Sequence, residues 1–438
     1  MLKQFRETLS KRTTRHARDG STSPRAYVLQ IPSESGPPVP NPVSGASKSV
    51  SEHPDFSLVL GGPLYQILLR AHMDGPALEL LQRRIVAAVL ITWLPLALLA
   101  LVNGSFLRGV SVPFLYDLDV HARFLLSLPL LIAAELLVHR RLRQIVDQFK
   151  DRDLLPPEVE HKFDSIIASA MRLRNSIVIE MVLLAVSFTG GYWVWESAAS
   201  LHTNTWYSRI DNGTASFTWA GYWYVFFSIP IFRFVLLRWY FRLCIWYLFL
   251  FRVSRLDLRL NALHPDRAGG LGFLGHSADA FAPVLMAQTI FLASVIANQI
   301  WHAGTSLTDF QFLIGGTVVF LMLIVLFPLA FFSIQMTSAK RAALREYGSF
   351  AAAYTADFRE KWLGGAWTSR QEELGSGDIQ SLADLGNSFA VVEDMGALPF
   401  RKELVVRLFV LLILPLLPLG LLIFPFEVLL KQLISLVL

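Results

Sequence analysis

Long apolar segments alternate with polar ones along the chain from about residue 85 onward. A helix that crosses the core of a bilayer needs about 20 apolar residues, and seven segments meet or approach this length. The pattern therefore predicts an all-α fold, a polytopic transmembrane helix bundle of about seven spans. The predicted spans cover residues 85–102, 124–138, 176–195, 219–237, 281–301, 312–334 and 404–426.

Two of these spans have unusual lengths. The second is short, but residues 142–149 continue one apolar face at helical spacing, so we expect its helix to extend beyond the membrane. The fourth stays apolar from 219 to 260, about 60 Å as one helix and twice the hydrocarbon thickness. Pro230 can bend this helix, or residues 239–260 can lie along the surface or project into the cytosol. A bent, partly interfacial helix is favoured.

The polar segments between the spans also carry helical patterns. The segment 154–174 has a proline start and the apolar positions Phe163, Ile166, Ile167 and Ala170 of an amphipathic helix. Residues 344–358 and 379–392 repeat apolar positions at steps of three and four. We therefore expect a small helical cytosolic cap, whose apolar faces are covered by each other, by the bundle, by lipid or by a second copy of the chain.

The chain divides into five predicted parts. Residues 1–56 form a disordered basic cytosolic tail, because they are rich in proline, serine and glycine and lack an apolar stretch. Residues 57–84 form amphipathic juxtamembrane helices. Residues 85–336 form a six-span membrane domain with cytosolic helical loops at 139–175 and 239–280. Residues 337–403 form a cytosolic helical segment, and residues 404–438 form the seventh span and the C-terminal tail.

Composition and charge agree with a membrane protein and indicate its orientation. Of 438 residues, 53% are hydrophobic and 17% charged, and the mean hydropathy is +0.46. Lysine and arginine number eleven before the first span, eight in 140–174, five in 242–267 and eight in 340–402, whereas the three outer loops hold only Arg108, Arg123 and Arg209. Because cytoplasmic loops are enriched in lysine and arginine, we expect a bacterial inner-membrane protein with a cytoplasmic N-terminus and a periplasmic C-terminus.

Several classes of chemistry are not supported by the sequence. A single cysteine, Cys244, excludes an intramolecular disulfide and a multi-cysteine metal site. The histidines lack metal-site spacing, and membrane orientation explains the net charge of +5 without nucleic acid. No metal, cofactor or catalytic residue is therefore predicted. The expected partners are membrane lipids, including anionic headgroups, and a second copy of the chain.

Five charged residues lie within the spans, where each costs at least about 2.5 kcal/mol at mid-bilayer. Under the predicted topology all five fall at a similar depth on the cytoplasmic side. They either pair to lock helices together, or line a cytosol-facing cavity that holds an ion, a proton or an anionic headgroup. The residues are Glu135, Glu180, Arg233, Arg238 and Arg407.

A second candidate site is the loop "LHPDRAGGLGFLG" at 263–275, before the fifth span. Its glycines free backbone N–H groups to approach a ligand, and the helix that follows adds partial positive charge, so a phosphate, carboxylate or headgroup is the natural guest. Alternatively, His-Pro-Asp only makes a turn and the glycines only allow tight packing. The spacing is not that of a nucleotide-binding loop. The candidate ligand-binding residues are His264, Asp266, Arg267, Gly269, Gly270 and Gly272.

The segments "HPDRAGGLGFLG" and "GDIQSLADLGNSF" together resemble segments of uncharacterised multi-pass membrane proteins of bacteria. The resemblance covers about the last half of the chain. It implies that the two segments belong to one cytosolic unit, and it carries over no activity and no site residue.

Three classes of function remain open. The leading hypothesis is a transport or permeation-related protein with a cytosol-facing polar site for an ion or an anionic group. The second is a membrane scaffold or binding protein that acts through its cap helices. The third is a lipid-modifying membrane enzyme, for which His264 and Asp266 are the only plausible acid–base pair.

Overall fold

The computed structural model describes residues 56–59, 61, 77–189, 204–211, 214–363 and 377–421, all within the compact unit Pro54–Leu438. The predicted basic tail lies outside these residues except for Phe56. Residues 62–76 of the predicted juxtamembrane helices, the end of the third predicted span and the C-terminal tail from residue 422 also lie outside them.

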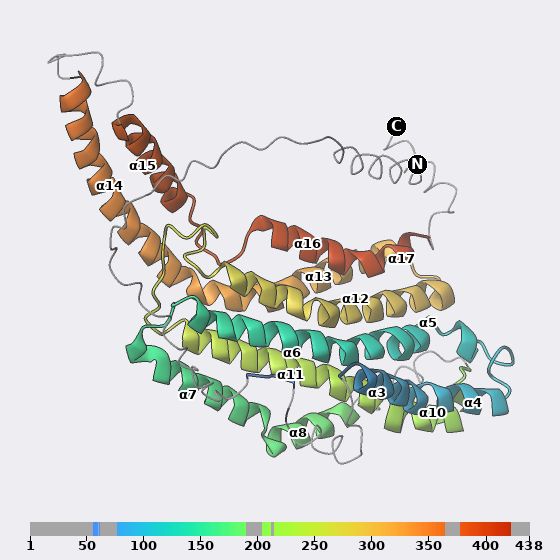
Figure 1. Ribbon diagram of the computed structural model, residues 1–438. Helices are drawn as coiled ribbons and strands as arrows, with labels where there is room; N and C mark the ends of the chain where they lie inside the picture. Colours follow the sequence, from blue (N-terminus) through green and yellow to red (C-terminus); the bar gives the residue numbers. More distant parts are fainter. Residues whose placement is uncertain are drawn as a thin grey trace, which may run out of the picture. The chain divides into compact units, whose positions relative to one another are not determined.

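Helices form nearly all of the described chain, as predicted (Figure 1). Its one hairpin pairs the strands β1 (Ser208–Asp211) and β2 (Thr214–Phe217) with Ser208 opposite Phe217. The α-helices are α3 (Ala77–Thr92), α4 (Leu94–Val102), α5 (Leu118–His121), α6 (Leu128–Asp151), α7 (Pro157–Arg174), α8 (Ile177–Phe188), α10 (Trp219–Trp223), α11 (Ile229–Val253), α12 (Gly275–Ala303), α13 (Gln311–Leu326), α14 (Ser333–Leu363), α15 (Gly377–Glu393), α16 (Lys402–Ile413) and α17 (Pro418–Leu421).

Six helical stretches among the described residues are long and apolar enough to cross a membrane. They match six of the seven predicted spans. The remaining one, predicted at 176–195, is described as α8, whose 12 residues are shorter than a crossing. The fold is thus that of a multi-pass helical membrane protein, and a seventh span stays a prediction. The six stretches are Leu81–Val102, Leu118–Asp151, Trp219–Val253, Gly272–Ala303, Leu307–Leu363 and Lys402–Gly420.

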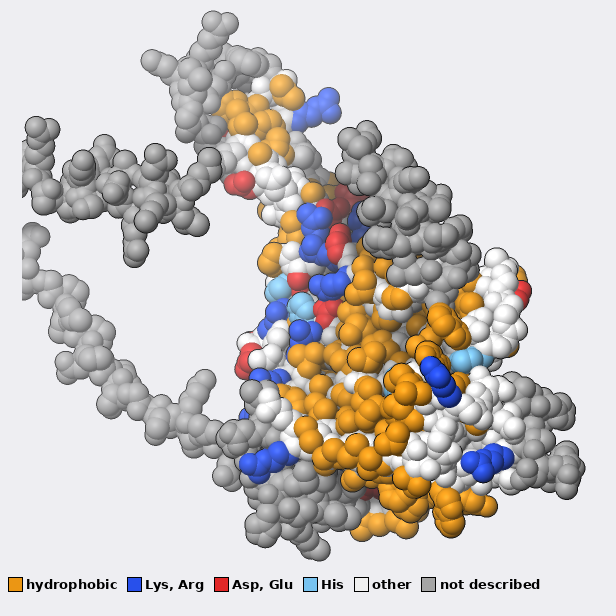
Figure 2. All heavy atoms as spheres, turned by 90° about the vertical axis from the view of Figure 1, so that its right-hand side faces the viewer, with side chains coloured by type: hydrophobic (Ala, Val, Ile, Leu, Met, Phe, Trp, Pro, Cys, Tyr) orange, Lys and Arg blue, Asp and Glu red, His pale blue; other side chains and the backbone are white. Residues whose placement is uncertain are grey.

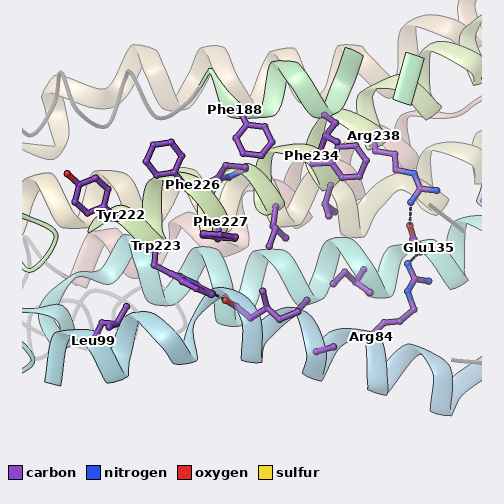
Figure 3. Close-up of a pocket in the computed structure, with 18 of the residues that line it drawn as sticks. Arg84, Leu99, Glu135, Phe188, Tyr222, Trp223, Phe226, Phe227, Phe234 and Arg238 are labelled. Atoms are coloured by element: carbon purple, nitrogen blue, oxygen red, sulfur yellow. Dashed lines mark hydrogen bonds and ion pairs between the residues drawn. The ribbon is translucent and has the colours of Figure 1, made fainter. Parts of the chain in front are cut away.

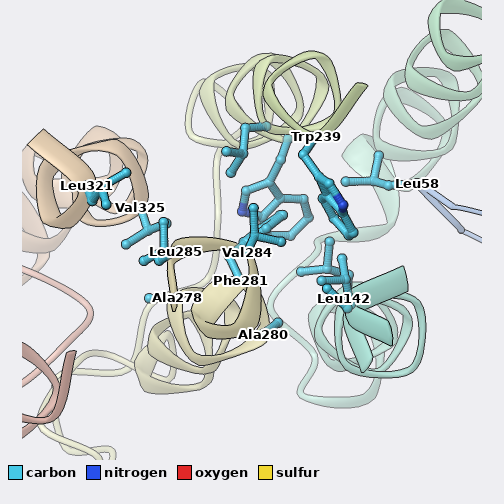
Figure 4. Packing of buried hydrophobic residues seen from close by; sticks show 14 of the residues in the cluster. Leu58, Leu142, Trp239, Ala278, Ala280, Phe281, Val284, Leu285, Leu321 and Val325 are labelled. Carbon is cyan, nitrogen blue, oxygen red and sulfur yellow. The ribbon is translucent and has the colours of Figure 1, made fainter. Parts of the chain in front are cut away.

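Helix α12 lies at the centre of the bundle and is the most buried of the six. It packs along α6, α13 and α16, and its alanines and serines allow this close approach, as small residues do in membrane helices. Figure 4 shows the core where Phe281 of α12 meets Trp239 of α11. The Trp239 indole N–H donates to the Leu131 carbonyl of α6 at 3.0 Å, so one side chain connects three helices.

In two spans, a wider π-helical turn directly precedes a proline. The segments Ala122–Ser127 and Tyr224–Ser228 are π-helical, and Pro129 and Pro230 follow directly in the first turn of α6 and α11. Proline lacks an N–H and clashes with the carbonyl four residues earlier, which a wider turn relieves. The fourth span accordingly remains one helical stretch from Trp219 to Val253.

The predicted extension of the second span is confirmed. Helix α6 continues to Asp151, with Leu142, Ile145, Val146 and Phe149 buried. Helix α7 buries Phe163, Ile167 and Ala170, as its pattern predicts. We call the end of the bundle at residues 140–175 and 254–275 the cap end.

The sixth span does not stop at the membrane. Residues Leu307–Leu363 form one helical stretch of 57 residues, about 85 Å at 1.5 Å per residue and nearly three times the hydrocarbon thickness. Its second half is α14, which runs beside α15 (Figure 1). The Tyr354 hydroxyl donates to the Asp378 carbonyl at 3.2 Å and helps to join the pair. The predicted cap therefore includes a continuation of a span.

Much apolar surface is left uncovered. Figure 2 shows a face on which hydrophobic side chains cover a broad area and charged side chains gather along its border. Large apolar residues of the spans, such as Val102 and Phe312, are more than 80% exposed. Such area on a water-soluble protein would cause association, whereas lipid covers it without cost.

The hairpin makes a testable contact with the fourth span. A Cβ added to Gly221 would overlap the carbonyl oxygen of Tyr207, and backbone cannot move aside as a flexible side chain can. We expect Gly221→Ala to lower the free energy of unfolding by about 1–3 kcal/mol, as overpacking does. Gly316→Ala in α13, where a Cβ meets open space, is the control and should be neutral or stabilising. Thermal unfolding in detergent measures both, and equal melting temperatures would contradict this packing.

Candidate functional site

An intramembrane carboxylate bound by arginines forms the centre of the candidate site. Glu135 of α6 accepts from Arg84 of α3 (Nη2 to Oε2, 2.5 Å) and from Arg242 of α11 (Nη2 to Oε1, 2.8 Å). The Glu135 and Arg242 side chains are only 9% and 3% exposed. Because a buried carboxylate without partners is strongly unfavourable, these contacts hold three helices together.

Two further charges complete this group. Arg238, one turn before Arg242 on α11, lies 3.9 Å from Glu135 (Nη1 to Oε1) and 3.7 Å from Glu180 of α8 (Nε to Oε1). We call Arg84, Glu135, Glu180, Arg238 and Arg242 the arginine–glutamate cluster. It unites three of the five residues proposed from the sequence and adds Arg84 and Arg242.

The cluster lies near one edge of the membrane. Arg84 lies in the first half of α3, and Glu135 is followed along α6 by the basic segment 139–143, which leads to the cap end. The cluster therefore lies at the cap-end side of the apolar part of these helices. At this depth water and lipid headgroups are within reach of a charged site.

Arg238 is the member with hydrogen-bonding capacity to spare. Its side chain is 11% exposed, both carboxylate contacts exceed hydrogen-bond length, and it donates no hydrogen bond to any described residue. Three guanidiniums also face two carboxylates. Nearby, burial and, as a smaller cause, the charge of Arg242 lower the pKa of Arg174.

A large apolar groove ends at this cluster. It has a volume of about 1070 Å³ and runs between α3, α4, α8 and the stretch Trp219–Arg238. Figure 3 shows Arg84 and Arg238 on either side of Glu135 at one end, and a row of aromatic rings leading away from them. The labelled rings are Phe188, Tyr222, Trp223, Phe226, Phe227 and Phe234.

The structure does not bring two of the proposed residues into the cluster. Arg233 is half-buried on α11 and makes no ion pair with a described residue. Arg407 of α16 pairs with Asp279 of α12 at 2.5 Å and is 60% exposed. It contacts α12 and no member of the cluster, although the sequence predicted that it lies at the same depth as Glu135.

The opposite end of the bundle holds a second buried polar network, which the sequence analysis missed. Asp117 accepts from the Trp206 indole (2.8 Å) and from Asn298 (3.2 Å). Asp119 pairs with Arg123, which donates to the Tyr224 hydroxyl at 3.1 Å. Arg123 and Tyr224 belong to the two π-helical segments, so both widened turns meet here. The Asp-x-x-x-Arg spacing at 119–123 was the available signal.

The glycine loop has an internal anion. The Asp266 carboxylate accepts the backbone N–H groups of Ala268 (2.8 Å), Gly270 (3.1 Å) and Gly272 (2.9 Å). Burial opposes ionisation, but these hydrogen bonds hold the pKa of Asp266 below its usual value. The donors that the sequence offered to a ligand therefore bind Asp266. His264 also belongs to the loop, with Nδ1 2.9 Å from Asp266 Oδ1.

The loop also connects the cap to the bundle. Arg267 has a positive φ of 55°, its carbonyl accepts from Gly396 at 2.8 Å, and its side chain lies 3.0 Å from Asp394. Gly269 at φ 67° passes so close to Met395 that a Cβ would lie 2.9 Å from its side chain. These contacts favour the structural interpretation of the loop.

A polar cavity of about 990 Å³ nevertheless adjoins the loop. Asp266, Arg267 and Gly272 line it together with Arg401, Lys402 and Arg407. Arg401 donates to the Asp266 carbonyl at 3.1 Å, so its nearest partner is the loop backbone. No group of three or more histidine, cysteine or acidic residues in the described part of the chain could hold a metal.

The fold and the cluster define the class, a multi-pass α-helical membrane protein with a charged cluster between its apolar helices. Comparisons with family models, with curated proteins and with solved structures found no match.

Removing the central carboxylate should destabilise the bundle. Glu135→Gln leaves buried guanidiniums uncompensated, and we expect a loss of about 3–5 kcal/mol in the free energy of unfolding. The double variant Glu135→Gln/Arg242→Gln should lose less than the sum of the single variants. Glu160→Gln, an exposed partner of Lys150, is the control with a small effect. Additive losses in thermal unfolding would contradict the pairing.

The loop interpretation predicts a stability effect that depends on pH. Asp266→Asn removes the negative charge that strengthens the hydrogen bonds from the backbone N–H groups. It should lower the free energy of unfolding by about 1.5–3 kcal/mol for each of these bonds that is weakened. Asp394→Asn changes an exposed ion pair and should lower it by at most about 1 kcal/mol. Because folding lowers the pKa of Asp266, its carboxylate stabilises the fold above the unfolded pKa of about 4 and loses this effect as pH falls through the folded pKa. The difference in melting temperature between wild type and Asp266→Asn should therefore shrink from pH 7 toward about pH 3. A constant difference would contradict the role of the charge.

Proposed function

We propose that this chain is a transport or permeation-related membrane protein whose arginine–glutamate cluster binds an anionic group at the cytosolic side of the membrane. The observation that carries the proposal is Arg238, a guanidinium within a span whose side chain is 11% exposed, at the end of a large groove, without a hydrogen bond to a described residue. Its ion pairs with Glu135 and Glu180 are longer than hydrogen bonds, so its N–H groups can still donate to a ligand, and ionisable residues within spans typically mark substrate pathways.

The charge balance supports an anion as the guest. Among the described residues of the cluster, three guanidiniums and two carboxylates leave one positive charge in excess, and electrostatic attraction is stronger near low-dielectric protein and lipid than in water. An anion bound at Arg238 would neutralise the positive charge that Glu135 and Glu180 leave uncompensated. A cation would be repelled by the same positive charge.

Orientation and location belong to the same proposal. We place the cap end in the cytoplasm of a bacterial cell, in its inner membrane, with the N-terminus cytoplasmic and the C-terminus periplasmic. The basic residues of 140–174 and 242–267 gather at the cap end, which supports this orientation by the positive-inside rule. The periplasmic C-terminus requires that α8 continue as a seventh span.

A scaffold function is the second candidate. Helices α14 and α15 project as a pair, and Phe350 and Ile379 on them are more than half exposed. Exposed apolar side chains on such a cap favour a protein partner or a second copy of the chain. A lipid-modifying enzyme has less support, because His264 and Asp266 are engaged within their own loop.

The proposal is tested by flux into vesicles of phosphatidylcholine and phosphatidylglycerol that contain the purified protein. Two probes are followed in parallel, inorganic phosphate and a fluorescent phosphatidylglycerol whose transfer between leaflets is read by quenching. Wild type should move one of them faster than protein-free vesicles. Arg238→Gln should reduce the rate at least about tenfold, the value of one charge-assisted hydrogen bond.

Arg233→Gln is the matched control, since Arg233 is a half-buried arginine on the same helix without an ion pair to a described residue. It should retain the wild-type rate. The proposal fails if wild type moves neither probe, or if Arg238→Gln is as active as wild type while equally folded.

A further inference from the structure

The groove has the length and the lining of a site for a membrane amphiphile. From Trp219 to Arg238 it follows 20 residues of helix. The 19 steps between them span about 28 Å at 1.5 Å per residue, close to the roughly 30 Å hydrocarbon thickness. Its volume of about 1070 Å³ exceeds the upper end of the usual range for small-molecule pockets, about 1,000 Å³.

The groove is open along its side. Phe188, Tyr222, Phe226 and Phe227 line it and are each about half exposed. In a membrane these rings face the lipid, so a guest can enter sideways from the bilayer. An aromatic wall with one charged end is complementary to an apolar chain with one charged head.

We infer that the groove binds an anionic membrane lipid, with its headgroup at Arg238 and Arg84 and its chain along the aromatic rings toward Trp219. This inference rests on the proposed function and names its substrate class. It explains why Arg238, which donates no hydrogen bond to a described residue, stands at the polar end of an otherwise apolar groove.

A water-soluble anion fits the site less well. It would occupy only the arginine end and leave the aromatic walls to unrelated lipid chains. A lipid without net charge would fill the walls but leave the excess charge of the cluster uncompensated. An amphiphile with a negative headgroup both pairs with the arginines and covers the aromatic walls of the groove.

Native mass spectrometry of the full chain released from nanodiscs tests this inference. The nanodiscs contain phosphatidylcholine and phosphatidylglycerol in equal amounts, and inorganic phosphate is added in a parallel sample. Wild type should retain one phosphatidylglycerol, enriched about fivefold over phosphatidylcholine, the effect of one arginine on an anionic headgroup. Arg238→Gln should lose this enrichment.

Two tryptophan variants separate the groove from general lipid contact. Ile231→Trp places an indole midway along the groove and should lower retention of phosphatidylglycerol. Val319→Trp is the control, because Val319 is exposed on α13 and does not line the groove. If Ile231→Trp does not fold, Leu184→Trp on α8 blocks the groove from its other side.

Each outcome is decisive. Binding of inorganic phosphate that needs Arg238 and ignores Ile231→Trp, without retained lipid, overturns the lipid inference and leaves the proposed anion site intact. Equal retention of both lipids, or equal loss in both tryptophan variants, overturns the inference as well. Binding of neither lipid nor phosphate overturns the inference and the proposed function together.

Discussion

The rest of the structure depends on the compensation of charge inside the membrane. Glu135 cannot remain ionised within a span unless cations meet it there, and Arg84 and Arg242 come from two different helices to do so. This requirement fixes how far α3 and α11 are shifted along α6. The groove between α3, α8 and α11 ends at the same residues, so the contact that aligns the helices also makes the polar end of the groove.

The two ends of the bundle differ in their local charge. At the cap end three arginines face two glutamates, whereas at the opposite end Asp117 and Asp119 face Arg123. The continuous stretch Leu118–Asp151 carries Asp119 and Glu135, some 24 Å apart at the helical rise. Between them the packing against α12 is mostly apolar, with Leu131 and Phe281 in the core, and the Ser127 hydroxyl donates to the Ala287 carbonyl at 2.9 Å. The bundle thus separates two charged regions by a mostly apolar layer.

Local sequence pattern predicted the elements well, because each element's apolar face repeats within a few residues. The extension of α6, the amphipathic face of α7 and six of the spans follow from such repeats. The ion pairs could not be predicted in the same way. Arg84 and Glu135 are 51 residues apart, and depth along a helix does not tell which side a residue faces. Arg407, predicted at the same depth, pairs with Asp279 of α12 and not with a member of the cluster.

The glycine loop shows a different limit of sequence reasoning. Its glycines predicted N–H groups that are free for a ligand, but Asp266 itself accepts from the N–H groups two, four and six residues later, those of Ala268, Gly270 and Gly272. An acidic residue so close to a run of glycines is an equally good signal for a loop whose own carboxylate accepts from its backbone N–H groups. The π-helical turns before Pro129 and Pro230 could be expected at proline, yet only the folded bundle shows that Arg123 and Tyr224 meet there.

The central claim is that Arg238 is held within the membrane to bind an anionic guest. Cryo-electron microscopy of the protein in nanodiscs that contain phosphatidylglycerol tests it most directly. The account predicts one elongated non-protein density in the groove, in contact with the Arg238 guanidinium at hydrogen-bond distance. A map in which Arg238 donates directly to Glu180 or Glu135, and neighbouring helices close the groove, would contradict it.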